Sequence, residues 1–130
     1  MRVVAAALYD AAGRVLIAQR PPGKHLAGRW EFPGGKVASG ESEPAALARE
    51  LREELGIDMR AARPFMRLTH AYADREVEVS LWIVERFSGT PRALDGQQLK
   101  WVAPAQLSHE DILEADRPFV AALAQLPPPG

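Results

Sequence analysis

The 130-residue sequence has no cysteine, no long apolar run and almost no net charge. Without cysteine, disulfide bonds and thiolate metal sites are excluded. No segment approaches the roughly 20 consecutive apolar residues that a transmembrane helix needs, so we expect no membrane partner. The formal net charge of -1 gives no broad attraction for a nucleic-acid polymer, which we also do not expect as a partner. An anionic ligand would therefore have to be bound by local groups or by metal ions.

What the sequence does contain is typical of a soluble globular protein with one domain. Hydrophobic residues make up 47% of the chain and charged residues 25%, which are ordinary fractions. We expect the domain to span residues 1–126 and a proline-rich tail to follow at 127–130. The apolar run near the start ends early, at Tyr9-Asp10, which favours a buried strand over a secretory leader. We expect a cytoplasmic location, with which the lack of cysteine is compatible.

The pattern of apolar residues predicts a mixture of strands and helices. Strands are expected at residues 3–8, 14–19, 30–32, 65–72, 76–87 and 99–102. Turn signals at 10–13 and 73–75 predict that the strands on either side of each turn form hairpins. Helical spacing predicts one helix at 43–55 and a last one after Asp116. This order of elements predicts an α/β sandwich around a mixed sheet.

The expected central helix has clear signals at both ends. Ser42 is a good N-cap residue, and Pro44 falls in the first turn, where its missing N–H group is harmless. Gly56 suits the position that follows the last turn. Helical spacing also predicts one apolar stripe that faces the core. This stripe consists of Pro44, Leu47, Ala48, Leu51 and Leu55.

Three acids, Glu50, Glu53 and Glu54, share a neighbouring stripe of the same helix. Like charges at positions i and i+4 cost about 0.2–0.5 kcal/mol, and the last turn, which holds two of these acids, favours cations. One explanation is a solvated face on which Arg49 and Arg52 reduce the repulsion. The other explanation is a functional site, because local rules that are broken together often mark one.

The loop before the helix favours the functional explanation. Pro33-Gly34-Gly35 combines a rigid turn with two residues that let a ligand approach the backbone closely. A backbone carbonyl beside several carboxylates offers the hard oxygen ligands that Mg²⁺ or Mn²⁺ prefers. The sequence therefore predicts a divalent-metal site where this loop meets the helix.

Loop and helix together carry a spaced motif. Its fixed positions are Gly35, Glu41, Arg49, Glu50, Leu51, Glu53, Glu54, Gly56 and Ile57. This motif resembles the complete signature of the Nudix hydrolases, and weaker similarity over nearly the whole chain is greatest to MutT-like nucleoside triphosphate pyrophosphohydrolases. The resemblance implies a Nudix-type α/β/α sandwich with a central mixed β-sheet, one catalytic helix and a C-terminal helix. It also implies hydrolysis of a nucleoside triphosphate to the monophosphate and pyrophosphate with Mg²⁺, or with Mn²⁺ as the alternative.

The resemblance further implies roles for the motif residues. The metal ligands would be the carbonyl of Gly34 and the carboxylates of Glu50, Glu53 and Glu54. Either Glu50 or Glu53 would act as the base for the attacking water. Arg49 would orient a carboxylate of the site. Three residues would support the loop and the helix, namely Gly35, Glu41 and Gly56.

Two acids outside the motif have two interpretations each. Asp95 matches a position where MutT-like proteins carry an assisting glutamate, which would add a metal ligand, but it also fits a plain Asp-Gly turn. Asp116 matches the asparagine that reads the base in relatives selective for oxidised guanine, and it equally suits the N-cap of the last helix. An ionised carboxylate only accepts hydrogen bonds, so an aspartate here weakens the oxidised-guanine interpretation.

Four further residues are candidates for substrate binding. Arg20 and Arg75 match arginines of MutT-like sequences and would bind phosphate or sugar, although each also fits a surface charge. Phe32 is a candidate for contact with the base, or else a core aromatic. His25 matches a MutT-like histidine, and otherwise it is a plain loop residue.

The leading hypothesis is therefore a MutT-like pyrophosphohydrolase that acts on a nucleotide, with removal of 8-oxo-dGTP from the nucleotide pool, a DNA-repair function, as one form. Alternatives of the same class are hydrolysis of CTP, dCTP or their modified forms, and of another nucleoside diphosphate derivative. An alternative of another class is a nucleotide-sensing module that binds without cutting, against which the complete set of acids argues. We expect a monomer or a homodimer.

Overall fold

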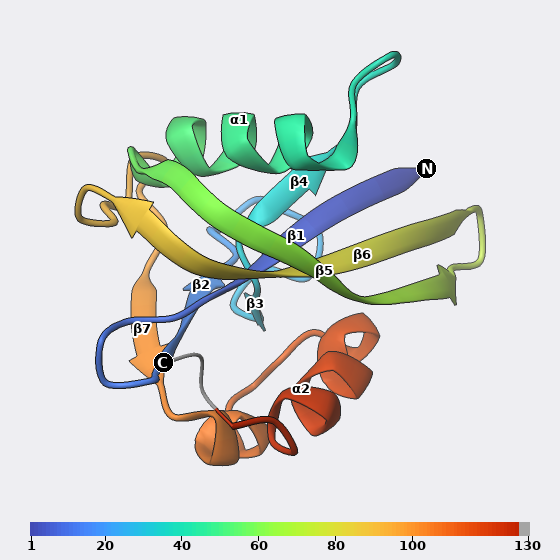
Figure 1. Cartoon of the computed structure of the whole chain (residues 1–130). Coiled ribbons are helices and arrows are strands. Elements are labelled where there is room, and N and C mark those ends of the chain that lie inside the picture. Colours follow the sequence, from blue (N-terminus) through green and yellow to red (C-terminus); the bar gives the residue numbers. More distant parts are fainter. Residues whose placement is uncertain (128–130) are drawn as a thin grey trace.

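The computed structural model describes residues 1–127, so most of the tail expected at 127–130 lies outside the described residues. Two α-helices and seven strands form the described part (Figure 1). In chain order the elements are β1 (Arg2–Leu8), β2 (Val15–Gln19), β3 (Trp30–Glu31), β4 (Gly34–Lys36), α1 (Glu43–Leu55), β5 (Asp58–Ala71), β6 (Glu76–Ser88), β7 (Leu99–Val102) and α2 (Arg117–Leu123). Two short 3₁₀ helices, η1 (Pro104–His109) and η2 (Glu114–Asp116), precede α2.

The strands form two sheets, with the orders β4-β1-β6-β5 and β3-β2-β7. The larger sheet is mixed, because β1 runs parallel to β6 and antiparallel to β4. The helices α1 and α2 lie on opposite sides of this sheet (Figure 1). The predicted α/β sandwich with a central mixed sheet, one central helix and one C-terminal helix is thus confirmed.

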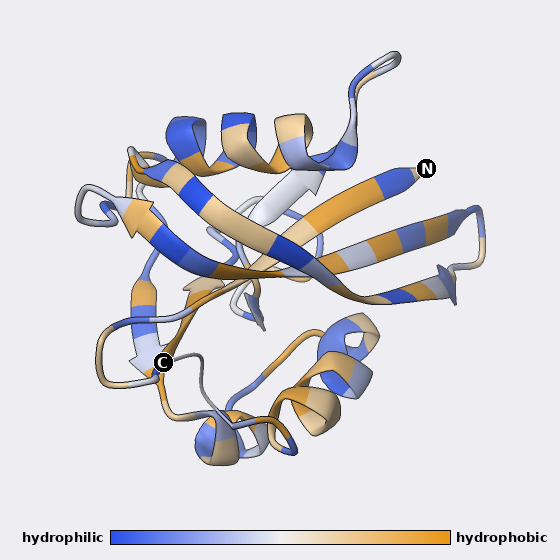
Figure 2. Cartoon of the chain, viewed as in Figure 1, coloured by the Kyte–Doolittle hydropathy of each residue, from blue (hydrophilic) through white to orange (hydrophobic). Residues whose placement is uncertain are grey.

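Strand β1 is the apolar centre of the molecule, and Figure 2 shows it apolar over most of its length. Its side chains alternate between the two faces of the sheet. Val4, Ala6 and Leu8 pack with the buried side of α1, whereas Ala5 and Ala7 pack in the cluster that includes α2. Both faces of β1 are therefore buried, which explains its continuous apolar run.

The predicted hairpin between the first two strands is wrong. β1 and β2 belong to different sheets, and only an isolated bridge joins Tyr9 to Val15. The turn itself exists, because the carboxylate of Asp10 accepts the N–H groups of Ala12 and Arg14. The strands diverge after it, since β1 takes β4 and β6 as partners on its two edges.

The second predicted hairpin is confirmed, since β5 and β6 are antiparallel and the N–H of Tyr72 donates to Arg75 across the turn. β5 begins earlier than the sequence predicted, at Asp58. Its first half is irregular, with register shifts around Ala61 and after Pro64, and this irregularity hides the alternation that marks a strand. β5 has β6 as its one partner in the sheet. The glycine-rich β4 was not predicted at all, because glycine is rare in strands.

Helix α1 has the predicted bounds and the predicted caps. The N–H of Ala45 donates to Ser42 Oγ at 3.2 Å, and Gly56 adopts the left-handed conformation with φ of 68°. The predicted core stripe needs one correction, since Pro44 is exposed and Ala48 is only half-buried. The residues that α1 buries are Ala46, Leu47, Leu51 and Leu55.

Helix α2 buries Phe119, Val120 and Leu123, as its spacing predicted. Asp116 stands at its N-cap position, but the side chain makes no capping hydrogen bond, so the capping role predicted for this carboxylate is wrong. The carboxylate is instead almost fully buried. None of the helices in residues 1–127 is long and apolar enough to cross a membrane.

Candidate active site

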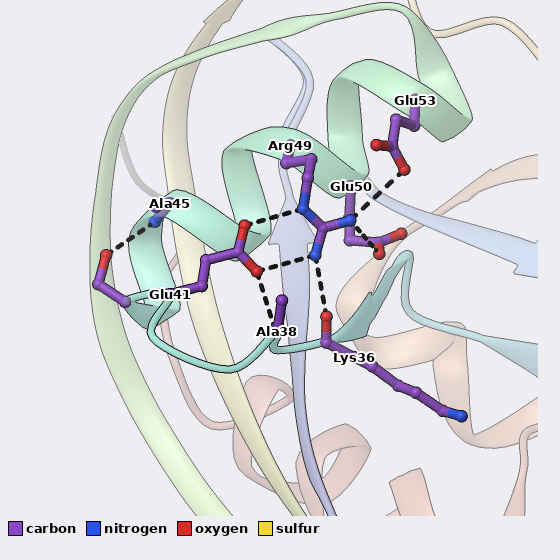
Figure 3. Close-up of polar contacts among 8 residues, drawn as sticks. Lys36, Ala38, Glu41, Ala45, Arg49, Glu50 and Glu53 are labelled. Atoms are coloured by element: carbon purple, nitrogen blue, oxygen red, sulfur yellow. Dashed lines mark hydrogen bonds and ion pairs between the residues drawn. The ribbon is translucent and has the colours of Figure 1, made fainter.

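Arg49 is the centre of the polar network between α1 and the loop before it (Figure 3). Its Nε and Nη2 donate to the two carboxylate oxygens of Glu41, at 2.8 and 2.9 Å. Nη1 donates to Glu50 at 2.9 Å and, more weakly, to Glu53 at 3.5 Å. Nη2 also donates to the carbonyl of Lys36 at 3.0 Å. One guanidinium thus joins the end of β4, the loop and the acidic stripe of the helix.

Glu41, the ion-pair partner of Arg49, also binds the backbone of the loop before α1. Its carboxylate also accepts the N–H of Ala38 at 2.9 Å, within the same loop. Hydrogen bonds from Arg49, and then this backbone bond, lower the pKa of Glu41 to about 2. The carboxylate is therefore ionised throughout the neutral range, and the bidentate pair with Arg49 is a permanent link.

The carboxylate of Glu50 lies directly over Gly35. A Cβ atom added to Gly35 would stand 2.6 Å from each of the two carboxylate oxygens, well inside van der Waals contact. Gly35 therefore leaves room for Glu50 to meet the backbone of β4. Gly34 has its own reason to be glycine, because its φ is 158° and an added Cβ would overlap the backbone of Val4 and Ala5.

The carboxylate of Glu54 lies close to Gly34 and to several other carboxylates. Burial is the main cause that raises its pKa to about 8, and the charges of Glu50, Glu31 and Asp95 raise it further. A hydrogen bond from the backbone of Gly34 acts in the opposite direction. Several carboxylates that oppose one another's ionisation form an oxygen-rich set whose repulsion a divalent cation would relieve. The donor set therefore fits a hard metal ion.

The three acids of the helix are not equivalent in the structure. The side chain of Glu50 is 15% exposed and that of Glu53 is 59% exposed. Within residues 1–127, no three histidine or acidic side chains are gathered closely enough to form a ready metal site. The structure thus brings Glu50 and Glu54 to the start of β4, at Gly34 and Gly35, and leaves Glu53 at the solvent side.

A cavity of about 730 Å³ opens beside this acidic group. Many of the predicted site residues line it, and these are Arg20, Phe32, Gly34, Gly35, Glu54, Arg75, Asp95 and Asp116. The other predicted residues, namely His25, Glu41, Arg49, Glu50, Glu53 and Gly56, are not in its lining. The volume lies within the range of about 300–1,000 Å³ that is usual for small-molecule sites.

Two further acids, Glu31 and Asp116, also line the cavity. Arg20 donates to Glu31 at 3.2 Å and to the carbonyl of His25 at 2.9 Å. Burial, and then the charge of Glu31, raises the pKa of Asp116 to about 7, while the backbone of Phe32 and the charge of Arg20 lower it. Burial also raises the pKa of Glu31. Near neutral pH, Asp116 is therefore present both as an acceptor and as a donor.

The other predicted binding residues are Phe32, in the wall of the cavity, and Arg75 and His25, which both contact Tyr72. Phe32 is buried and packs edge-to-face on Phe119, with ring centroids 6.4 Å apart, so it is a core aromatic that also touches the cavity. Arg75 stacks over the ring of Tyr72, with its guanidinium carbon 5.4 Å from the centroid. The His25 ring lies edge-on to the same tyrosine at 6.4 Å. Tyr72 thus joins the hairpin tip to the loop that carries His25.

Sequence reasoning missed several polar residues of the cavity wall, among them Glu31, Tyr72 and Gln97. Gln97 is buried, its Oε1 accepts the N–H of Asp95 at 3.0 Å, and its Nε2 donates to the carbonyl of Glu54 at 3.5 Å. It thereby ties the loop of Asp95 to the end of α1. Glu31 had a signal, as an acid between two aromatics next to the glycine turn. For Gln97 and Tyr72 the sequence carries no such signal.

The motif, the fold and the site all have counterparts in known proteins. The model of the NUDIX domain matches residues 4–122. The 8-oxo-dGTP diphosphatase of Escherichia coli K12 is 32% identical over 97% of this chain and 98% of its own length. The CTP pyrophosphohydrolase of the same strain is 38% identical over 95% and 91%, respectively. The crystal structure of a MutT Nudix hydrolase from Burkholderia pseudomallei superposes with a TM-score of 0.82, at 30% identity over 97% of each chain.

These matches extend far beyond the motif of residues 35–57 and include both helices and both sheets. The family suggested by the motif is therefore confirmed across the whole described domain. This chain belongs to the Nudix hydrolases and is a MutT-type member of that family.

Proposed function

We propose that this chain hydrolyses a nucleoside triphosphate to the monophosphate and pyrophosphate, with Mg²⁺ or Mn²⁺ as the required metal. The observation that carries the proposal is the pair of helix carboxylates beside Gly34 and Gly35: Arg49 holds Glu50 over Gly35, and Glu54 lines the adjacent cavity of about 730 Å³. Nudix hydrolases generally depend on divalent metals. Two relatives are named for nucleoside triphosphates, which supports the substrate class.

The metal would be held by residues from the loop and the helix. We assign this role to the carbonyl of Gly34 and to the carboxylates of Glu50, Glu53 and Glu54, with Asp95 as a further ligand from the facing loop. A bound Mg²⁺ neutralises phosphate oxygens and lowers the pKa of a coordinated water. Glu53 is 59% exposed, so its carboxylate is free to turn towards the site when a cation is present.

The other residues of the helix and loop act through position and charge. Arg49 holds the carboxylate of Glu50 at 2.9 Å, and Glu41 holds Arg49 through two hydrogen bonds. Arg75, on the rim of the cavity, is our candidate for a phosphate contact. Arg20 is engaged with Glu31 and His25, so we assign it to the shape and charge of the cavity.

The general base is one of two carboxylates on α1. Glu50 is held rigidly by Arg49, which suits a group that must be aimed. Glu53 is exposed and only weakly held, at 3.5 Å, which suits a group that moves into the site. Comparison of Glu50→Gln with Glu53→Gln over a range of pH decides between them, because the base is the one whose loss removes the acidic limb of the kcat profile.

A cytidine triphosphate is a second candidate substrate, and these two acids of the cavity favour it. Asp116 is buried and lines the cavity together with Glu31. A carboxylate there accepts a hydrogen bond from an exocyclic amino group, such as that of cytosine. The alternative is oxidised guanine, for which Asp116 would have to donate as well as accept.

A panel of triphosphates tests the proposal. The protein is incubated with Mg²⁺ and with ordinary, oxidised and modified nucleoside triphosphates, and kcat/KM and the products are measured for each. Monophosphate plus pyrophosphate is the expected outcome, and diphosphate plus phosphate contradicts the proposed cleavage. Binding of nucleotides without turnover would instead support the sensing module.

Two variants test whether the proposed site residues are responsible for the activity measured in this panel. Glu53→Gln should lower kcat by orders of magnitude with an unchanged free energy of unfolding, because the side chain is exposed and packs against nothing in the core. Activity at the wild-type level in this variant contradicts the metal assignment. Asp116→Ala should change the ranking among bases, whereas an equal loss for every substrate contradicts its role in base selection.

A further inference from the structure

The first residue of α1, Glu43, is anchored to the larger sheet by several side chains. Its Oε1 accepts the indole N–H of Trp82 at 3.0 Å. Its Oε2 accepts hydrogen bonds from Arg2 at 3.1 Å and from Arg67 at 2.9 Å. The side chain of Glu43 is only 10% exposed. Glu43 lies outside the fixed positions of the Nudix motif, and no role in the reaction has been assigned to it above.

The donors do not hold Glu43 equally. Arg2 and Arg67 are long side chains that are 54% and 60% exposed, and exposed ion pairs of this kind contribute little. Trp82 comes from β6, which lies between β1 and β5 in the sheet, and its ring packs against the apolar cluster under α1. Its N–H is therefore a fixed partner, and it faces the oxygen of Glu43 that the arginines do not use. The buried hydroxyl of Ser80, on the same strand, is a further fixed partner of Glu43.

Glu43 shares one stripe of α1 with two proposed metal ligands. Glu50 and Glu54 follow it by seven and eleven residues. At about 100° per residue these positions lie within about 20° of Glu43 around the helix axis. A rotation of α1 that moves Glu43 away from Trp82 therefore also moves the carboxylates of Glu50 and Glu54.

We propose that Glu43 is a positioning residue, which fixes the rotation of α1 through Trp82 and so aims Glu50 and Glu54 at the start of β4. The Arg49–Glu41 pair holds the loop side of the helix, and Glu43 holds the sheet side. The effect on catalysis rests on the function proposed above, whereas the effect on metal binding is measured independently of any turnover.

The size of the effect follows from the geometry of a helix. A carboxylate lies about 5–6 Å from the helix axis, so a rotation of about 10° moves it by about 1 Å. Misplacement of a catalytic group by about 1 Å costs up to about 100-fold in rate. We therefore expect kcat to fall by about 10-fold to 100-fold when the anchor is lost.

Four variants distinguish the effect of the Glu43–Trp82 hydrogen bond on the site from an effect on the stability of the fold. Glu43→Ala removes the acceptor, and Trp82→Phe removes only the indole N–H. Glu43→Gln keeps a carbonyl oxygen for Trp82 but loses the charge that faces the two arginines. The control is Glu78→Gln, which removes the other carboxylate near Arg67, at 3.7 Å, without touching α1.

Each variant is compared with the wild type in three measurements, namely urea unfolding, Mg²⁺ binding by calorimetry, and kcat and KM for a triphosphate that the wild type hydrolyses. Glu43→Ala and Trp82→Phe should bind Mg²⁺ about 10-fold more weakly and lose kcat, with KM for the nucleotide nearly unchanged. Glu43→Gln and Glu78→Gln should behave like the wild type, and all four should unfold cooperatively.

Three results would overturn the proposal. The first is wild-type Mg²⁺ affinity in Glu43→Ala or in Trp82→Phe. The second is a loss of Mg²⁺ affinity in Glu43→Gln as large as that in Glu43→Ala, because the ion pairs with the arginines would then matter and the hydrogen bond from the indole would not. The third is a wild type that binds no Mg²⁺, which also contradicts the proposed function. If the wild type binds Mg²⁺ but hydrolyses no triphosphate, the proposed function alone fails, and the Mg²⁺ affinities still decide on Glu43.

Discussion

Replacement of Gly35 by alanine tests whether the position of the Glu50 carboxylate matters for turnover. Gly35 does not adopt the left-handed backbone region, so alanine fits its backbone without strain. The new methyl group would stand 2.6 Å from each carboxylate oxygen of Glu50, and ordinary contact begins at 3.4 Å. The carboxylate must therefore move by about 1 Å, because the methyl group is fixed to the backbone of β4.

The expected result is a selective loss of activity. A displacement of about 1 Å corresponds to about a 100-fold lower kcat/KM, which equals about 2.7 kcal/mol of transition-state stabilisation. Stability should change by less than about 1 kcal/mol, because Arg49 keeps its two bonds to Glu41 and no core side chain moves. The loss should appear mainly in kcat, since Arg75 and Asp116, the residues proposed to bind the nucleotide, are not among the atoms that the new methyl group would meet.

The assay is steady-state hydrolysis of the preferred triphosphate at saturating Mg²⁺, together with urea unfolding of the same preparation. Gly34→Ala is the matched control, because its methyl group would lie 2.7 Å from the Cα of Ala5 in β1, and backbone cannot give way as a side chain can. That variant should lose stability as well as activity. Activity within about threefold of the wild type in Gly35→Ala would refute the close contact between Gly35 and Glu50 as a functional feature.

Two further predictions concern stability. The folded pKa of Asp116, about 7, lies above its ordinary value of 3.8, so between these pH values the folded protein keeps a proton that the unfolded chain has lost. Asp116 should therefore lower the free energy of unfolding as pH rises through this window, by at most about 1.4 kcal/mol per pH unit. Glu31 and Glu54 also have raised pKa values, so Asp116→Asn should show a shallower slope than the wild type in urea titrations at pH 4–8, and parallel curves would contradict this. Leu51→Ala should cost about 2–5 kcal/mol in urea unfolding, because Leu51 is fully buried between α1 and the sheet, and a cost below 1 kcal/mol would show that the core is not packed as described.

The parts of the fold that the sequence predicted well are those determined by local interactions. The ends of α1 follow from Ser42 and Gly56, whose preferences depend on neighbours within one turn. The last strand and the β5–β6 turn were predicted for the same reason. The pairing of β1 was not predictable, because its partners β4 and β6 lie far away in the sequence and only the fold brings them together.

The candidate site likewise has features that the sequence predicted and features that only the tertiary structure shows. The motif residues on α1 could be read from spacing, because a helix fixes which of them share a face. The contact of Gly35 with Glu50 and the anchoring of Glu43 by Trp82 depend on how the helix sits on the sheet. The burial of Asp116 was missed because its position suits an N-cap equally well, and only the tertiary structure shows that its carboxylate lies inside the cavity wall.

Strand β5 has a consequence for how copies of this protein meet in solution. It is 14 residues long and has β6 as its one partner, so its outer side presents unpaired backbone groups that could recruit a strand from another chain. Pro64 lacks an N–H group there, the register shifts bend the strand, and Arg60, Arg63 and Arg67 are exposed along it. These features oppose the addition of a further strand. A long edge strand is therefore compatible with a low tendency to aggregate. Replacement of Pro64 by valine would restore an N–H group and remove part of that protection.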